Sequence, residues 1–185
     1  MRVIAGEFRS RKLKTLPGLD VRPTPDRLRE ALFNVLAPSI GGTVFLDAYA
    51  GTGAVGIEAL SRGASRAIFL ERSRAAANII RDNLHSLQLA GRAEVAVGKV
   101  IQLLPRYTSD IVFLDPPYPL EKEYDAAFLV LGAAPPGLVI AQHATRTSLQ
   151  PLYGQLERIR VLKQGDNSLS FYQPKRQSNT SLETR

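Results

Sequence analysis

"TVFLDAYAGTGAVGIEALSRG", residues 43–63, decides the fold class, because it reads as a strand, a glycine turn and a helix in direct succession. Its apolar start ends at Asp47, which is typical of a strand buried on both faces. Gly51-Thr52-Gly53 then opens a helix that closes at Gly63, and glycines there allow a ligand close to the backbone. The segment therefore predicts one unit of an α/β fold with a ligand at the end of its strand.

The same alternation of short apolar runs and longer amphipathic segments continues along the chain. Six further strands are expected, at 66–71, 92–98, 109–118, 137–144, 156–165 and 168–174. Helices are expected between the first five strands, at 54–63, 73–91, 99–105 and 122–134. Strands that alternate with helices favour right-handed crossovers. The prediction is a Rossmann-like, doubly wound and mostly parallel sheet of seven strands, with the fourth strand beside the first.

A small basic extension is predicted ahead of this domain. Residues 1–6 and 19–23 suggest two short strands of a hairpin joined by a Lys/Arg-rich loop, and a helix follows. Thr24 is expected as its N-cap, with Pro25 in the first helical position. The apolar stripe of this helix is expected to consist of Leu28, Ala31, Leu32, Val35 and Leu36. The predicted organisation is an extension over 1–40, a catalytic domain over 41–174 and a polar, disordered tail over 175–185.

Composition excludes several classes of protein. With 185 residues, 44% hydrophobic and 22% charged, the chain suits one soluble globular domain. It has no cysteine and only two histidines, His85 and His143, so we expect no metal site. No apolar run approaches the roughly 18 residues of a membrane span, and the start lacks a signal peptide's apolar region. A cytoplasmic protein with no membrane partner is expected.

Positive charge is concentrated at one end of the chain. The net charge is +7, and residues 1–29 carry eight Lys or Arg against three acids. A cationic surface attracts phosphate-rich polymers and releases their counterions on binding. The sequence therefore predicts a nucleic-acid contact at this end. The residues expected to hold phosphate are Arg2, Arg9, Arg11, Lys12, Lys14, Arg22 and Arg27.

A nucleoside cofactor is indicated by two strand ends together. Glu71 ends the second predicted strand, 18 residues after Gly53, where a carboxylate can accept both hydroxyls of a ribose. "GTGAVG" at 51–56 also matches the dinucleotide fingerprint literally, so an NAD enzyme stays an alternative. However, Asp47 lies four residues before the first glycine, where it would repel a pyrophosphate but suit an ammonium group. This favours S-adenosylmethionine (SAM) over NAD.

A third strand end, "FLDPPYP" at 113–119, carries the predicted reaction chemistry. An exocyclic base amine is a poor nucleophile because its lone pair is delocalised into the ring. If the Asp115 carboxylate and the Pro116 carbonyl accept its N–H bonds, the lone pair can be aimed at the SAM methyl group. Pro116 and Pro117 stiffen the turn. Tyr118 offers a ring on which a flipped or single-stranded base can stack.

The motifs "LDAYAGTG", "FLERS" and "VFLDPPY" resemble those of class I SAM-dependent methyltransferases that modify exocyclic base amines. With "MRVIAGEFRSRKLK" and "RPTPDRLREALFNVL" ahead of them and "KQGDNSLSFY" behind, the chain is similar to the RsmD family of 16S rRNA (guanine-N2)-methyltransferases. The resemblance runs from Met1 to about Pro174. It implies methyl transfer from SAM to N2 of a guanine in 16S rRNA of the small ribosomal subunit, by an enzyme expected to be a monomer.

The resemblance also assigns site residues. Asp115 to Tyr118 would form the catalytic turn. The residues implied in cofactor binding are Thr24, Asp47, Ala48, Tyr49, Gly51, Thr52, Gly53, Glu71, Arg72, Lys99 and Val100. Two positions depart from the family pattern: Lys99 replaces an aspartate that would bind the adenine amino group, and Gln142 replaces a glutamate. Because lysine cannot accept a hydrogen bond, backbone groups near Val100 are expected to read the adenine edge.

Three alternatives stay open from the sequence. An adenine-N6 methyltransferase acting on DNA or RNA shares the D-P-P-Y motif. Guanine is favoured slightly, since its N1–H and N2–H groups both suit the acceptor-only carboxylate of Asp115. A catalytically idle RNA-binding assembly factor on the same fold is a different class, and the NAD enzyme is the third. His143 is expected to be a structural polar residue rather than a base.

Overall fold

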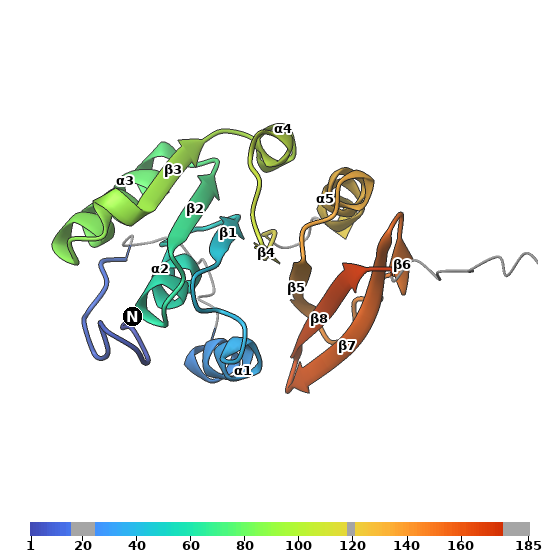
Figure 1. The fold of residues 1–185 in the computed structure, drawn as a ribbon, viewed down its shortest axis with the longest axis horizontal. Helices are drawn as coiled ribbons and strands as arrows, with labels where there is room; N and C mark the ends of the chain where they lie inside the picture. Colours follow the sequence, from blue (N-terminus) through green and yellow to red (C-terminus); the bar gives the residue numbers. More distant parts are fainter. Residues whose placement is uncertain (16–24, 118–120, 176–185) are drawn as a thin grey trace, which may run out of the picture.

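The computed structural model of the protein describes residues 1–15, 25–117 and 121–175. Eight strands form one sheet in the order β3-β2-β1-β4-β5-β8-β7-β6 (Figure 1). The parallel part consists of β1 (Val44–Ala48), β2 (Arg66–Glu71), β3 (Ala93–Val97), β4 (Ile111–Leu114) and β5 (Leu138–Ala144). The antiparallel part consists of β6 (Leu152–Tyr153), β7 (Leu156–Gln164) and β8 (Asn167–Pro174).

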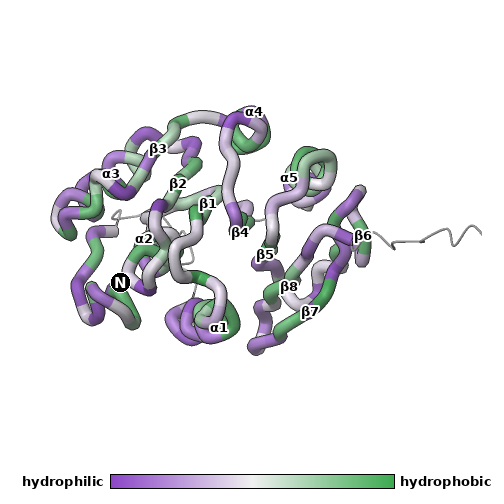
Figure 2. The backbone as a smooth tube through the Cα atoms, in the orientation of Figure 1, coloured by the Kyte–Doolittle hydropathy of each residue, from purple (hydrophilic) through white to green (hydrophobic). Residues whose placement is uncertain are grey.

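Helices cover both faces of the sheet, as a doubly wound fold requires. On one face α4 (Val100–Leu103) and α5 (Glu121–Ala133) pack against Leu46, Val112 and Val139. On the other face lie α1 (Asp26–Leu36), α2 (Ala54–Ser61) and α3 (Arg74–Ser86). Two 3-10 turns, η1 (Ala90–Arg92) and η2 (Leu104–Arg106), complete the described elements. Figure 2 shows hydrophilic and hydrophobic residues alternating around α1 and α3, as expected of helices with one buried side.

The predicted fold class is confirmed, and the strand count is one too low. β2 has the predicted bounds, and β1 lies between β2 and β4 as expected. The additional strand is β6, which has only two residues and pairs with the start of β7. A pair of residues is too short to show the periodicity by which a strand is recognised in sequence.

The N-terminal extension differs in detail from the predicted hairpin. Arg2 forms an antiparallel bridge with Lys12, so the second side of the hairpin comes from the segment expected to be a loop. Val3 N–H donates to Arg11 O at 3.0 Å, and Leu13 N–H to Met1 O at 3.0 Å. Residues 19–23, the expected second strand, lie outside the described residues. We call residues 1–15 the N-terminal arm.

Helix α1 begins one residue later than predicted, with Pro25 rather than Thr24 in the N-cap position and no side-chain capping bond. Thr24 lies outside the described residues. The buried face of α1 consists of Leu28, Arg29, Leu32, Phe33 and Leu36, whereas the predicted Ala31 and Val35 are half-buried. Arg29 is buried because its guanidinium meets polar partners on the N-terminal arm and on α2, described below.

Two further expectations concern the rest of the chain. Within the described residues, no helix is both long enough and apolar enough to cross a membrane. The predicted disordered tail, apart from Lys175, lies outside the described residues.

Candidate active site

Three carboxylates converge at the carboxyl edge of three neighbouring strands. Asp47 lies in β1, Glu71 is the last residue of β2, and Asp115 directly follows β4. Asp47 is only 2% exposed, and burial raises its pKa well above the usual range. The hydrogen bond from Gly56 N–H, 2.9 Å from Asp47 Oδ2, opposes that shift, while the negative charges of Asp115 and Glu71 increase it. Burial therefore favours the protonated form of Asp47 in the free protein, and a cationic ligand at this edge would favour its ionised form.

The glycine turn after β1 is held in place by Glu71. Gly51 N–H donates to Glu71 Oε2 at 2.8 Å, and Ser73 N–H donates to Oε1 at 2.7 Å. Gly51 and Gly53 have φ of 57° and 77°, a left-handed conformation that favours glycine. Gly53 is also the N-cap of α2, so the turn leads directly into the helix. We call residues 51–53 the cofactor turn, after the role predicted for them from the sequence.

The third glycine of "GTGAVG", Gly56, has a packing role. A Cβ atom there would lie 2.3 Å from the Phe69 ring of β2. Only glycine therefore lets α2 approach the sheet this closely, which is the role of the last glycine in a nucleotide-binding turn.

Two predicted cofactor residues precede the turn: Ala48 ends β1, and Tyr49 follows it. The Ala48 side chain is buried in the core, so only its backbone could face a ligand. Tyr49 has a φ of 66°, and its hydroxyl donates to Glu123 Oε2 on α5 at 2.7 Å. Burial raises the pKa of Tyr49, and Glu123 adds to the shift. Its side chain thus joins the turn to α5.

The predicted catalytic turn begins at the same edge. Leu114, the last residue of β4, is in register with Ala48 of β1, so Asp115 follows beside the cofactor turn. Asp115 is half-buried, Pro116 is buried and Pro117 is exposed. Tyr118 lies outside the described residues.

The remaining cofactor candidates lie around the ends of β2 and β3. Gly98 N–H donates to Glu71 O at 3.0 Å, which ties the turn after β3 to the end of β2. Lys99 is exposed at the N-cap of α4, and the Val100 side chain is buried. Arg72 is exposed next to Glu71.

The predicted phosphate-binding residues of the N-terminal arm point outward. Their side chains, those of Arg2, Arg9, Arg11, Lys12 and Lys14, are all exposed. Arg27 on α1 is also exposed, and Arg22 lies outside the described residues. Between them, Val3 and Leu13 are buried against α2 and α3. The arm thus exposes basic side chains, while Val3 and Leu13 pack against the helices beneath it.

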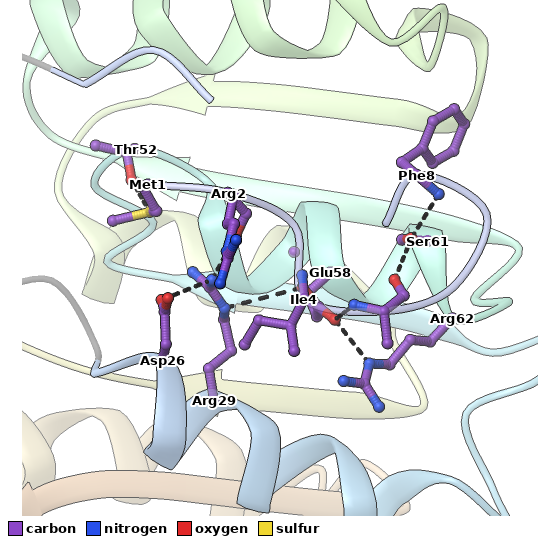
Figure 3. Close-up of polar contacts among 12 residues, drawn as sticks. Met1, Arg2, Ile4, Phe8, Asp26, Arg29, Thr52, Glu58, Ser61 and Arg62 are labelled. Atoms are coloured by element: carbon purple, nitrogen blue, oxygen red, sulfur yellow. Dashed lines mark hydrogen bonds and ion pairs between the residues drawn. The ribbon is translucent and has the colours of Figure 1, made fainter. Parts of the chain in front are cut away.

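Sequence reasoning missed the polar groups that anchor this arm (Figure 3). Glu58 of α2 is fully buried and accepts from Ile4 N–H at 2.8 Å and Ala5 N–H at 3.0 Å. It also pairs with Arg62 at 2.8 Å, and Arg29 Nε lies 3.9 Å away. Arg29 in turn donates to Arg2 O at 2.6 Å. An acid inside an otherwise apolar helix was the one signal that could have indicated such a site.

His143 has the structural role expected of it. Its Nδ1 lies 2.9 Å from Ala144 O, which can only accept, so Nδ1 carries the proton and Nε2 accepts from Ser170 Oγ at 2.8 Å. Burial lowers the pKa of His143. Gln142 is buried, and its backbone carbonyl accepts from the Tyr124 hydroxyl. No group of three or more potential metal ligands occurs in the described part of the chain.

Known proteins match this chain over most of its length. The model of a family described as Conserved hypothetical protein 95 matches residues 1–173. The putative rRNA methyltransferase YlbH of Bacillus subtilis (strain 168) is 34% identical over 181 residues, covering 93% of this chain and 98% of that protein. Ribosomal RNA small subunit methyltransferase D of Haemophilus influenzae is 42% identical over 123 residues, which span 64% of each protein.

A solved structure shares the whole fold. The putative methyltransferase yhhF from Escherichia coli superposes with a TM-score of 0.83 at 30% identity, covering 96% of this chain and 99% of that one. The family model covers the sheet, the glycine turn and the N-terminal arm of this chain. The chain belongs to the Conserved hypothetical protein 95 family, which is the RsmD family that its motifs resemble, and it has the fold of a class I methyltransferase.

Proposed function

We propose that the protein transfers a methyl group from SAM to the exocyclic N2 amine of a guanine in small-subunit ribosomal RNA. The observation that carries this proposal is the convergence of Asp47, Glu71 and Asp115 beside a glycine turn. The relatives named above, a small-subunit rRNA methyltransferase and a putative rRNA methyltransferase, support the choice of RNA.

The residues present fit SAM in charge and in hydrogen bonding. SAM carries a sulfonium and an ammonium group, and both suit an edge lined by carboxylates. A carboxylate offers about four acceptor sites, and the two backbone bonds to Glu71 leave room for ribose hydroxyls. When bound, SAM supplies an electrophilic methyl group. NAD fits less well, because its pyrophosphate would lie beside the buried Asp47.

The protein's part in the reaction is to orient the amine and to receive its proton. Asp115 and the Pro116 carbonyl each accept a hydrogen bond from one N–H group of the amine. This directs the nitrogen lone pair toward the methyl group. The proton lost after transfer goes to the Asp115 carboxylate, which is half-buried but reaches solvent. This is catalysis by orientation, with the stiff Pro116-Pro117 turn set before the substrate arrives. Tyr118 is proposed to stack on the flipped base.

The exposed basic residues of the N-terminal arm are proposed to hold RNA phosphates. Such contacts position the RNA without reading its sequence, so affinity should fall as salt rises. The proposed substrate is the small ribosomal subunit in the cytoplasm, and the enzyme is proposed to act as a monomer without a metal.

The test compares nucleosides digested from 16S rRNA of a wild-type strain and a deletion strain by mass spectrometry. We expect loss of one N2-methylguanosine, restored by the wild-type gene and by Asp166→Ala, a change in an exposed turn, but not by Asp115→Ala. Loss of N6-methyladenosine instead would identify an adenine enzyme. Unchanged nucleosides together with a ribosome assembly defect would identify an idle assembly factor. Full activity of Asp115→Ala would refute the mechanism.

A further inference from the structure

The N-terminal arm lies along the whole of α2, the helix that directly follows the cofactor turn. At the far end of α2, Phe8 N–H donates to Ser61 Oγ at 3.0 Å, and Ser61 Oγ donates to Ala5 O at 2.6 Å. Midway, Glu58 accepts from Ile4 and Ala5. At the near end the Thr52 hydroxyl donates to Met1 Sδ at 3.6 Å (Figure 3). The arm and the cofactor turn thus share one helix as support.

A single buried side chain, Asn83 of α3, joins the two. Asn83 is 1% exposed. Its Oδ1 accepts from Lys14 N–H at 2.7 Å, and its Nδ2 donates to Lys14 O at 3.1 Å. The same Nδ2 donates to Thr52 O at 3.3 Å. One amide therefore bonds the backbone of the arm and the backbone of the cofactor turn at the same time.

The bonds of Asn83 occur where the arm carries exposed charge. Lys12 and Lys14 flank the buried Leu13, so a shift of the Lys14 backbone moves both basic side chains. Lys14 Nζ lies 2.9 Å from Asp82 Oδ2, and both side chains are more than half exposed, at 62% and 53%. Exposed ion pairs of this kind are weak, so Lys14 can exchange Asp82 for a phosphate.

We infer that Asn83 is a positioning residue that couples the N-terminal arm to the cofactor turn, so that cofactor and RNA each strengthen the binding of the other. The inference rests on the proposed function. Cofactor binding orders the backbone of Gly51 and Thr52, and through Asn83 it orders Lys14. RNA that then binds the arm loses less conformational freedom, which gives positive cooperativity. Because such coupling is reciprocal, RNA strengthens cofactor binding by the same factor.

The test measures binding of small ribosomal subunits, purified from a deletion strain, with and without saturating S-adenosylhomocysteine, the product form of SAM. For the wild-type protein we expect the product to tighten subunit binding by about fivefold or more. In Asn83→Ala the ratio of subunit affinity with the product to affinity without it should fall well below the wild-type ratio. It should not reach one, because the bond from the Thr52 hydroxyl to Met1 Sδ remains. The matched control is Asn78→Ala on the same helix, an exposed residue that accepts a hydrogen bond from Arg81, and it should keep the wild-type ratio.

The ratio separates coupling from a merely structural role. A substitution that only loosens the fold weakens binding with and without the product alike, and it leaves the ratio unchanged. The inference is overturned if the product does not change subunit binding by the wild-type protein. It is also overturned if Asn83→Ala shows the same ratio as the wild type. A protein that binds subunits but neither binds S-adenosylhomocysteine nor methylates refutes the proposed function instead.

A second measurement needs only the wild-type protein, and so does not depend on whether Asn83→Ala folds. Hydrogen exchange should slow in peptides covering residues 1–15 when S-adenosylhomocysteine is added, because the Lys14 amide is bonded to Asn83. The turn between β7 and β8 is the internal control and should not change. Slower exchange confined to the cofactor turn, with none in the arm, overturns the inference.

Discussion

Removing the Glu58 carboxylate should detach the N-terminal arm and destabilise the whole domain. In Glu58→Ala the Ile4 and Ala5 amides lose their acceptor, and the fully buried Arg29 loses a carboxylate. Burial lowers the pKa of Arg29. The negative charge of Glu58 is the largest of the effects that oppose this shift. Breaking a buried pair by removing one partner costs about 3–5 kcal/mol. For a domain of this size that lowers Tm by roughly 6–20 °C.

The assay is thermal unfolding followed by circular dichroism, together with limited proteolysis of the first 15 residues. Glu58→Gln keeps the side-chain volume and one acceptor oxygen, so its Tm should lie between those of the wild type and Glu58→Ala. The matched control is Glu157→Ala, an exposed glutamate on β7, which should melt with the wild type. A Glu58→Ala protein that melts within about 2 °C of the wild type, less than 1 kcal/mol, would refute the reasoning.

Three further predictions concern a glycine, a buried acid and a histidine. In Gly6→Ala the new Cβ would lie 1.9 Å from Ser61 O at a φ of +84°, so the arm should become sensitive to protease, whereas Gly41→Ala, with open space, should not. Asp47→Asn removes a buried carboxylate, so without cofactor its Tm should rise by about 1–8 °C while calorimetry shows weaker SAM binding. Because the folded-state pKa of Asp47 is raised, wild-type stability should fall as pH rises above the ordinary value of 3.8, and the asparagine should flatten this fall. The folded-state pKa of His143 is lowered, so stability should fall as pH drops below its ordinary value of 6.5, and His143→Gln should flatten that part of a Tm-against-pH profile.

The parallel part of the sheet could be predicted from the sequence because each strand contains a short apolar run. Arg66–Glu71 has the predicted bounds for this reason, since both faces of β2 are covered. Arg29 was missed for the opposite reason. A charged residue on an amphipathic helix is expected to face water, and its buried partner Glu58 lies 29 residues further along the chain. Pairing over that distance leaves no local pattern.

The carboxylates of the candidate site could also be predicted from the sequence. Asp47, Glu71 and Asp115 each follow or end a strand, and parallel strands bring such ends together. Asn83 gave no signal, because its partners are the backbone atoms of Lys14 and Thr52, and every residue has such atoms. The candidate side chains at the strand ends were therefore predicted from their position, whereas the side chains that hold the backbone in place were not.

Polar anchoring of the N-terminal arm serves specificity more than stability. Val3 and Leu13 give the arm apolar contact but do not fix its register, because a slip of two residues along an extended segment keeps the same face buried. Such a slip would displace every basic side chain by about 7 Å. The bonds from Ile4 and Ala5 to Glu58 exist in one register only, since a buried carboxylate that loses its donors is strongly unfavourable. The buried acid thus sets where the exposed cations lie relative to the cofactor turn. In the proposed function, that geometry decides which phosphates an RNA must present there.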